Sequence, residues 1–176
     1  QLRDLALAAS DLLVNKQGGP PVYPYQPGQD LWREANSMSP SYAQSTGEGL
    51  RRRSLYSVWK RTAPLPNMLV FDATSREVCT ISRGRTNTPL QALVLLNDVQ
   101  FVEAARALAT AVAKQHAAPQ DRLAEAFLRL TGRQPDEQEL TLLVELYQEQ
   151  LAIFQEGGAE EAAKLLAIGE TPHDES

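Results

Sequence analysis

The chain has 176 residues, of which 43% are apolar and 22% charged, and its formal net charge is −5. This composition is typical of a folded globular chain, and it argues against an intrinsically disordered or membrane protein. Because no apolar run reaches the roughly 20 residues that a membrane-spanning helix needs, we expect no membrane span.

The first third of the chain changes from a helical to a proline-rich pattern. Leucine and alanine at helical spacing predict an amphipathic helix over residues 2–14. The run GGPPVYPYQPG at 18–28 holds four prolines and three glycines, which exclude a helix and favour an extended arm. Residues 30–36 fit a short helix anchored by Trp32. Residues 47–62 fit a longer basic helix.

The segment at 64–88 lacks helical spacing. Its β-prone runs at 68–73 and 77–82 flank a turn, which is typical of a small β-hairpin. The same runs also fit an extended arm lying over helices, because their alternation of apolar and polar residues is weak. Cys79 has apolar and β-branched neighbours, so we expect a buried, unreactive thiol.

The remainder of the chain has the strongest helical pattern. Thr88, Pro89 and Gln91 form a helix start with a capping box, and the apolar run that follows predicts a helix buried at the centre of a bundle. Further helices are predicted over residues 98–117, 119–131, 136–155 and 159–168. We therefore predict a mainly α fold. It would be a single domain over residues 1–176, with an irregular helical bundle at 89–168, the proline-rich arm at 18–28, and the hairpin or extended segment at 64–88.

Positive charge gathers in the middle of a chain that is acidic elsewhere. Residues 51–85 hold eight basic and two acidic residues, a net of +6, whereas residues 119–176 hold four basic and thirteen acidic ones, a net of −9. This asymmetry fits an anion-binding centre, or a basic middle that docks on the acidic tail of the same fold. The negative total charge argues against nucleic acid as a partner.

Candidate ligand-binding residues lie mostly just before the helix that starts at Pro89, where free backbone N–H groups favour an anion. One interpretation is a pocket for phosphate, carboxylate or a charged glycan. The alternative is that these side chains clamp acidic residues or carbonyl groups of neighbouring helices. Exposed aromatic rings, Tyr23 and Tyr25 among them, suit either sugar stacking or packing of the proline-rich arm. The candidates are Trp59, Arg76, Arg83, Arg85 and Asn87.

Few residues of the chain suit catalysis or metal binding. Asp72 and Glu77 are the only acids in the basic centre, and such a carboxylate pair would suit a polysaccharide hydrolase. This hydrolase is the alternative to a non-catalytic helical module that binds a ligand or other domains. The single cysteine and two distant histidines predict neither a metal site nor haem attachment in this chain.

Three stretches of the chain together carry a family resemblance. They are GGPPVYPYQPGQDLW, RRSLYSVWKRTAPLPNMLVFDATSREVC and RTNTPLQALVLLNDVQFVEAARALA. They closely resemble the planctomycete cytochrome-c-associated C-terminal domain, a bacterial family of unknown function. Because the pattern of that family extends past both ends of this chain, we expect an excised core of a larger multidomain protein.

The resemblance implies a context rather than an activity. It implies a large envelope or secreted protein, hence an extracytoplasmic location, with a link to polysaccharide use. The other domains of the parent protein would be partners of this one, and any haem c would belong to a cytochrome-c-like module outside this chain. The resemblance implies no catalytic residue and no cofactor here.

Overall fold

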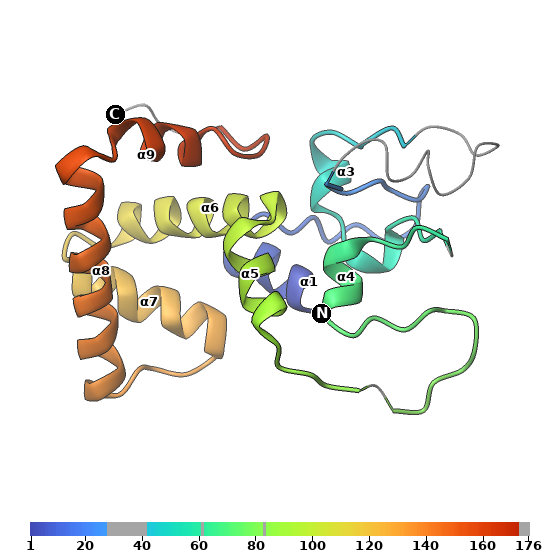
Figure 1. The fold of residues 1–176 in the computed structure, drawn as a ribbon, viewed down its shortest axis with the longest axis horizontal. Coiled ribbons are helices and arrows are strands. Elements are labelled where there is room, and N and C mark those ends of the chain that lie inside the picture. Colours follow the sequence, from blue (N-terminus) through green and yellow to red (C-terminus); the bar gives the residue numbers. More distant parts are fainter. Residues whose placement is uncertain (28–41, 61, 83, 173–176) are drawn as a thin grey trace. The chain divides into compact units, whose positions relative to one another are not determined.

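The computed structural model describes residues 1–27, 42–60, 62–82 and 84–172 (Figure 1). Within these residues the fold is mainly helical, as the sequence predicts, and the extended segments meet only in isolated bridges. None of the described helices is long and apolar enough to cross a bilayer. The predicted helix at 30–36, with Trp32, lies outside the described residues.

The chain forms two compact units. The first consists of Gln1–Asp4 with Leu13–Phe101, and the second of Leu5–Leu12 with Val102–Ser176. The prediction of one domain over residues 1–176 stays a prediction.

The first unit holds short helices joined by extended chain. Its helical elements are the start of α1 (Leu2–Ala9), α3 (Glu48–Arg51), the 3-10 helix η1 (Ser54–Tyr56), α4 (Pro66–Val70) and α5 (Pro89–Asn97). Helix α1 ends well before residue 14, where the sequence placed its end. The chain adopts a left-handed conformation at Asp11, with φ 59°, and the Val14 amide then donates to the Arg51 carbonyl over 3.0 Å.

The described part of the proline-rich arm, residues 18–27, contains no helix, as predicted. It bends at residues 18–20, where Gly18 and Gly19 have φ 72° and 90°, and residues 21–26 follow without a bend. Val22 forms a parallel bridge with Ser57: its amide donates to the Tyr56 carbonyl, and its carbonyl accepts from the Val58 amide, both at 2.9 Å. Tyr25 is only 8% exposed, so this ring serves packing. Backbone pairing therefore orders a segment that cannot form a helix.

The predicted basic helix at 47–62 is wrong. Only α3 and η1 form, and Arg52 between them is extended, with ψ 156°. The Arg52 side chain is buried, donates to the carbonyl groups of Lys16, Gly18 and Pro20, and lies 4.0 Å from the centre of the Tyr56 ring. These tertiary bonds require an extended backbone, which local helical propensity cannot supply.

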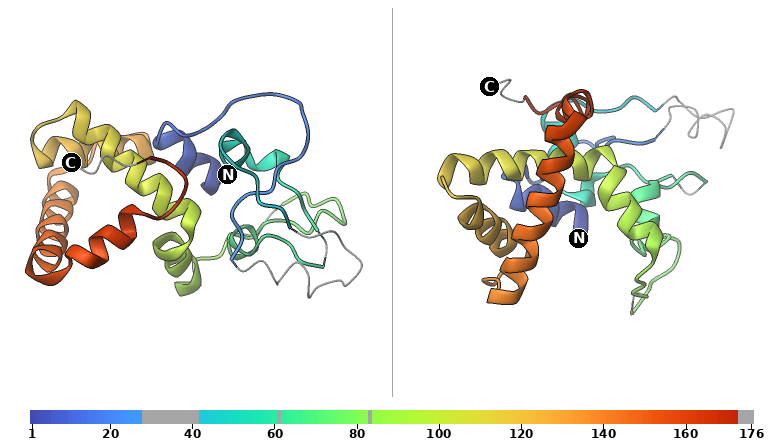
Figure 2. Two further views of the ribbon diagram at one scale, coloured as in Figure 1. Left: turned by 90° about the horizontal axis from the view of Figure 1, so that it is seen from above. Right: turned by 60° about the vertical axis from the view of Figure 1, so that its left-hand side comes forward.

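The described residues of 64–88 do not form the β-hairpin; outside the short helix α4 they are closer to the alternative interpretation, an extended arm. Residues 66–70 are helical because Pro66 starts α4, and residues 77–82 form no strand. Residues 73–82 and 84–88 instead form a long arm, visible in Figure 2 as a green loop without helix. Cys79 is exposed there, which contradicts the expected buried thiol. The apolar residues Val78 and Ile81 are exposed as well, at 73% and 106%.

Helix α5 begins as predicted but is not buried. The Thr88 side chain accepts from the Gln91 amide, and the Gln91 side chain accepts from the Thr88 amide, which completes the capping box. The predicted burial is wrong, since Gln91 is the buried residue of the helix while its leucines are exposed. Their exposed fractions are 53% for Leu90, 56% for Leu93, 45% for Leu95 and 74% for Leu96.

The second unit contains the longer helices, and all of them were predicted. They are most of α6 (Val99–Gln115), then α7 (Pro119–Thr131), α8 (Glu137–Gly157) and α9 (Ala159–Leu166), drawn from yellow to red in Figure 1. Helix α7 ends at Gly132, whose φ of 75° is the left-handed conformation that glycine adopts without strain. The buried apolar residues of this unit are Leu7, Ala9, Ala104, Leu108 and Val112.

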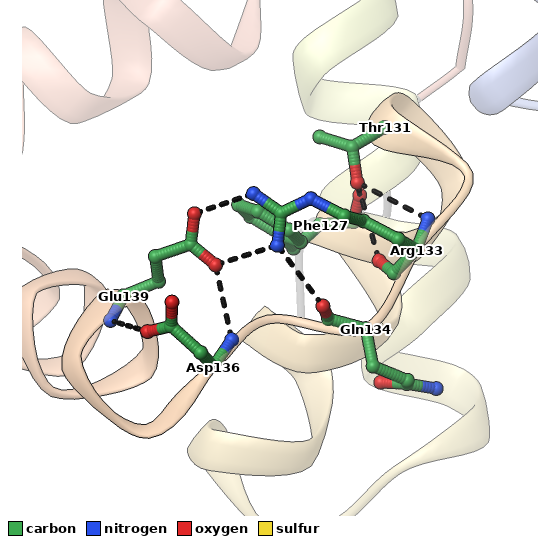
Figure 3. A network of polar contacts seen from close by, with 6 residues as sticks. All are labelled: Phe127, Thr131, Arg133, Gln134, Asp136 and Glu139. Atoms are coloured by element: carbon green, nitrogen blue, oxygen red, sulfur yellow. Dashed lines mark hydrogen bonds and ion pairs between the residues drawn. The ribbon is translucent and has the colours of Figure 1, made fainter.

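A polar network closes the turn from α7 to α8 (Figure 3). The Arg133 guanidinium donates to both Glu139 oxygens, at 2.6 and 2.7 Å, and lies over the Phe127 ring. Glu139 also accepts from the Asp136 amide, and Asp136 caps the Glu139 amide in return. The hydrogen bonds from Arg133 lower the pKa of Glu139 to about 2.

Helix α6 also holds the segment that follows α9. The buried Glu103 carboxylate accepts from the Thr171 amide at 2.7 Å, and Arg106 donates to the carbonyl groups of Ile168 and Thr171. Gly169, with φ 87°, lies so close that an added Cβ would be 2.6 Å from Glu103 Cδ. This turn therefore requires glycine.

Candidate functional site

A cavity of about 1290 Å³ lies within the first unit and is the candidate site. Its volume exceeds the roughly 300–1,000 Å³ of a typical small-molecule pocket. The start of α1, the chain around η1, helix α4 and the 73–88 arm contribute its walls. The lining residues that matter below are Arg3, Asp4, Arg53, Ser54, Leu55, Trp59, Met68, Phe71, Asp72, Arg76, Ile81, Arg85, Thr86 and Gln91.

The described lining of this cavity carries a positive net charge. It includes four arginines and two aspartates, a difference of +2. Asp4 accepts from the amide and hydroxyl of Ser54, at 2.7 and 2.6 Å. In contrast, Arg53 and Arg85 are exposed, and neither side chain makes an ion pair or hydrogen bond with the described residues. Their charges are therefore available to a ligand.

Arg3 supports one wall of the cavity rather than serving a ligand. It is 4% exposed, and it donates from Nε to Gln100 Oε1 at 3.0 Å and from its terminal nitrogens to the carbonyl groups of Leu50 and Arg52, at 2.6 and 2.8 Å. Burial lowers the pKa of this guanidinium. Arg3 thus ties α1 to α3 and the residue after it.

Trp59 and Arg76 lie against each other at the cavity. The central guanidinium carbon of Arg76 is 5.0 Å from the centre of the Trp59 ring, which is a cation–π contact. Arg76 is exposed, and its backbone has φ 62°, a conformation that is uncommon outside glycine. Asp72, four residues earlier, also has a positive φ, 56°.

A chain of hydrogen bonds closes the base of the 73–88 arm. The Asp72 carboxylate accepts from the Thr86 amide at 2.8 Å and from the Thr86 hydroxyl at 2.9 Å. Gln91 Nε2 donates to Thr86 Oγ1 at 2.9 Å and to the Val70 carbonyl at 2.8 Å. Asp72, Thr86 and Gln91 therefore hold this loop. The predicted clamp was assigned to Arg83, Arg85 and Asn87 instead; Arg85 makes no such bond with the described residues, and Arg83 lies outside them.

The cavity brings together some of the predicted site residues and leaves others out. Trp59, Arg76 and Arg85 line it, whereas Asn87 is exposed and does not. Arg83 lies outside the described residues. Sequence reasoning missed Arg53, because three consecutive arginines give no sign of which one is exposed.

The carboxylate pair of the hydrolase hypothesis is not assembled at the cavity. Asp72 lines it with both oxygens accepting from Thr86, and Glu77 is not among the lining residues. Among the described residues, no group of His, Cys, Asp and Glu side chains is arranged to hold a metal ion. Hydrolysis by Asp72 and Glu77 stays a hypothesis without a supporting contact.

Comparison with known proteins places the chain in a family. Residues 1–147 match the family described as PSD1, protein of unknown function (DUF1553). The chain belongs to the PSD1 family. No curated protein and no solved structure matches it. The description of PSD1 assigns no activity, so the cavity is the basis for a proposed function.

Proposed function

We propose that this PSD1 chain is a non-catalytic helical module that binds an anionic ligand in the cavity of its first unit. The observation that carries the proposal is the excess of unpaired guanidinium groups there: Arg53 and Arg85 have no partner among the described residues, and Arg76 contacts only the Trp59 ring. A cavity wall with several unneutralised cations attracts anions over distances of about a Debye length, roughly 8–10 Å.

The apolar part of the lining favours a ligand that also has carbon surface. Leu55, Trp59, Met68, Phe71 and Ile81 all contribute to the walls. An inorganic ion would leave this surface exposed to water, whereas the apolar faces of sugar rings would cover it. We therefore propose an acidic glycan, bearing carboxylate or sulfate groups, as the ligand.

The wider setting is a proposal of its own. The sequence resembles a planctomycete domain that accompanies cytochrome c modules, so we propose that the chain is part of a large envelope or secreted protein. In this proposal the module also packs against other domains of that protein, and any haem c is bound by one of those domains. Binding of an acidic polysaccharide would fit an extracytoplasmic location.

Calorimetric titration and thermal shift with an acidic oligosaccharide test the binding proposal, with the uncharged oligosaccharide of the same length and sodium chloride of equal ionic strength as reference ligands. At a ligand concentration of one hundred times Kd, the expected stabilisation is about 2.7 kcal/mol. The acidic oligosaccharide should bind, and the uncharged one should bind far more weakly.

Arg53→Ser and Arg85→Ser assign the binding to the cavity. Each removes one unpaired guanidinium and should weaken the affinity for the acidic oligosaccharide by about five- to tenfold, since a hydrogen bond to a charged group contributes about 1.5–3 kcal/mol before solvent screening. Lys16→Ser is the matched control, because Lys16 is an exposed cation outside the cavity lining. Equal affinities in all of these variants, or no binding by the unmodified chain, would refute the proposal.

A further inference from the structure

The contact between Trp59 and Arg76 differs from the other positive charges of the cavity. Arg76 is held against an aromatic ring, whereas Arg53 and Arg85 make no such contact with described residues. We infer that the Trp59–Arg76 pair is the specificity element of the cavity, and that it selects anionic groups with two oxygens on one edge, such as carboxylate and sulfate. This inference rests on the proposed anion-binding function.

The backbone conformation near Arg76, beside the Trp59 ring, is unusual. Asp72 and Arg76 both adopt a left-handed backbone conformation, with φ 56° and φ 62°, which is uncommon for residues other than glycine. Hydrogen bonds to Thr86 hold Asp72, and the Trp59 ring holds Arg76. Aspartate adopts this conformation more readily than arginine, so Arg76 is the less usual of the two, and it lines the cavity.

The chemistry follows from the shape of the guanidinium group. All five of its N–H bonds lie in one plane and point to its edges. The central carbon of Arg76 lies 5.0 Å from the centre of the Trp59 ring, and its N–H groups donate to none of the described residues. Two parallel N–H groups then match the two oxygens of a carboxylate or sulfate in a bidentate contact. Since the ring already restricts the side chain, less rotational freedom is lost when the ligand binds.

A lysine at this position would retain the charge but not the recognition. Its ammonium group is compact and cannot present two parallel donors to an anion. Arg85 is the internal comparison, because it lines the same cavity and contacts no aromatic ring of the described residues. The inference therefore predicts that an arginine-to-lysine change matters more at residue 76 than at residue 85.

The test measures the affinity of the full chain for sodium sulfate at constant ionic strength, with sodium chloride as the balancing salt. Arg76→Lys should weaken sulfate binding roughly tenfold, and Arg85→Lys, which keeps a charge in the cavity at a residue without a ring contact, should weaken it by a smaller factor of about two to three. Trp59→Phe, which keeps a smaller ring, should weaken binding by about two- to fivefold. In the unmodified chain, sulfate should shift the NMR signal of the Trp59 indole N–H, which chloride should leave in place.

The outcomes separate the inference from the proposal beneath it. Equal affinities of Arg76→Lys and Arg85→Lys would overturn the inference, and binding lost in Arg53→Ser or Arg85→Ser would still support the anion-binding function. Absence of binding by the unmodified chain, for sulfate and acidic oligosaccharide alike, would overturn both. Exchange of the Val58 amide, which donates to the Val22 carbonyl, checks that each variant retains the fold around Trp59.

Discussion

Replacing Arg3 by methionine should destabilise the first unit more than any exposed arginine change. The guanidinium is 4% exposed and donates to the Leu50 carbonyl, the Arg52 carbonyl and Gln100 Oε1. Arg3→Met keeps much of the apolar stem and removes every donor. Three buried acceptors then lose a partner, and leaving each unpaired costs about 1–3 kcal/mol.

The net magnitude is smaller than the sum of those losses. Removing Arg3 also removes the unfavourable burial of its charge, the same burial that lowers its pKa. Taking about 1.5 kcal/mol for each acceptor and allowing for this relief, we expect a loss of about 3 kcal/mol in the free energy of unfolding. This corresponds to a change of roughly 150-fold in the unfolding equilibrium.

Urea unfolding followed by circular dichroism, together with amide hydrogen exchange, measures this loss. The most informative amides are those of Val14 and Val22, which donate to the Arg51 and Tyr56 carbonyl groups beside the Arg3 contacts. Arg53→Met is the matched control and should change stability by less than about 0.5 kcal/mol, because Arg53 is exposed. If Arg3→Met and Arg53→Met had the same stability, the structural role of Arg3 would be refuted.

Three further predictions test separate parts of the structure. In Arg133→Gln, the pKa of Glu139 should rise from about 2 toward its ordinary value of 4.5, as measured by carbon NMR titration. In the unmodified chain, the stabilisation from this pair is present above pH 4.5 and is lost as the pH falls through about 2. An unchanged pKa in the variant would contradict the contact. Cys79 should react completely with a thiol reagent without denaturant because it is exposed, and a protected thiol would restore the buried interpretation. Gly169→Ala should lower the free energy of unfolding by about 2 kcal/mol or more, because the added Cβ would collide with Glu103. A thermal unfolding midpoint equal to that of the unmodified chain would contradict this packing.

The helix limits that sequence reasoning predicted correctly all depend on local chemistry. The Thr88 capping box acts within one helical turn, and so does the left-handed glycine at 132. Pro119 starts α7 because it occupies a first-turn position where no backbone donor is needed. Such interactions involve residues a few positions apart, so they can be read directly from the sequence.

The errors occur where distant parts of the chain compete with local propensity. The expected basic helix does not form because the backbone around Arg52 is extended and forms parallel bridges with Val14 and Val22. The hairpin, one of the two interpretations of residues 64–88, does not form; instead Asp72 and Thr86, 14 positions apart, hold the two ends of the arm together. Neither pairing leaves a periodic signal in the sequence.

For the candidate site, the sequence identified the basic character of the centre and named Trp59, Arg76 and Arg85. It could not tell that Arg3 and Arg52 are buried beneath carbonyl groups while Arg53 is exposed, because neighbouring arginines have the same local pattern. Nor could it show that the leucines of α5 stay exposed, since apolar composition specifies a tendency to be buried and not the surface that buries it. Caps and periodicity are properties of one helix and follow from the order of its residues. The burial of individual side chains depends on which remote segments of the chain contact each other in the fold. The same is true of the cavity and of the contact between Arg76 and Trp59.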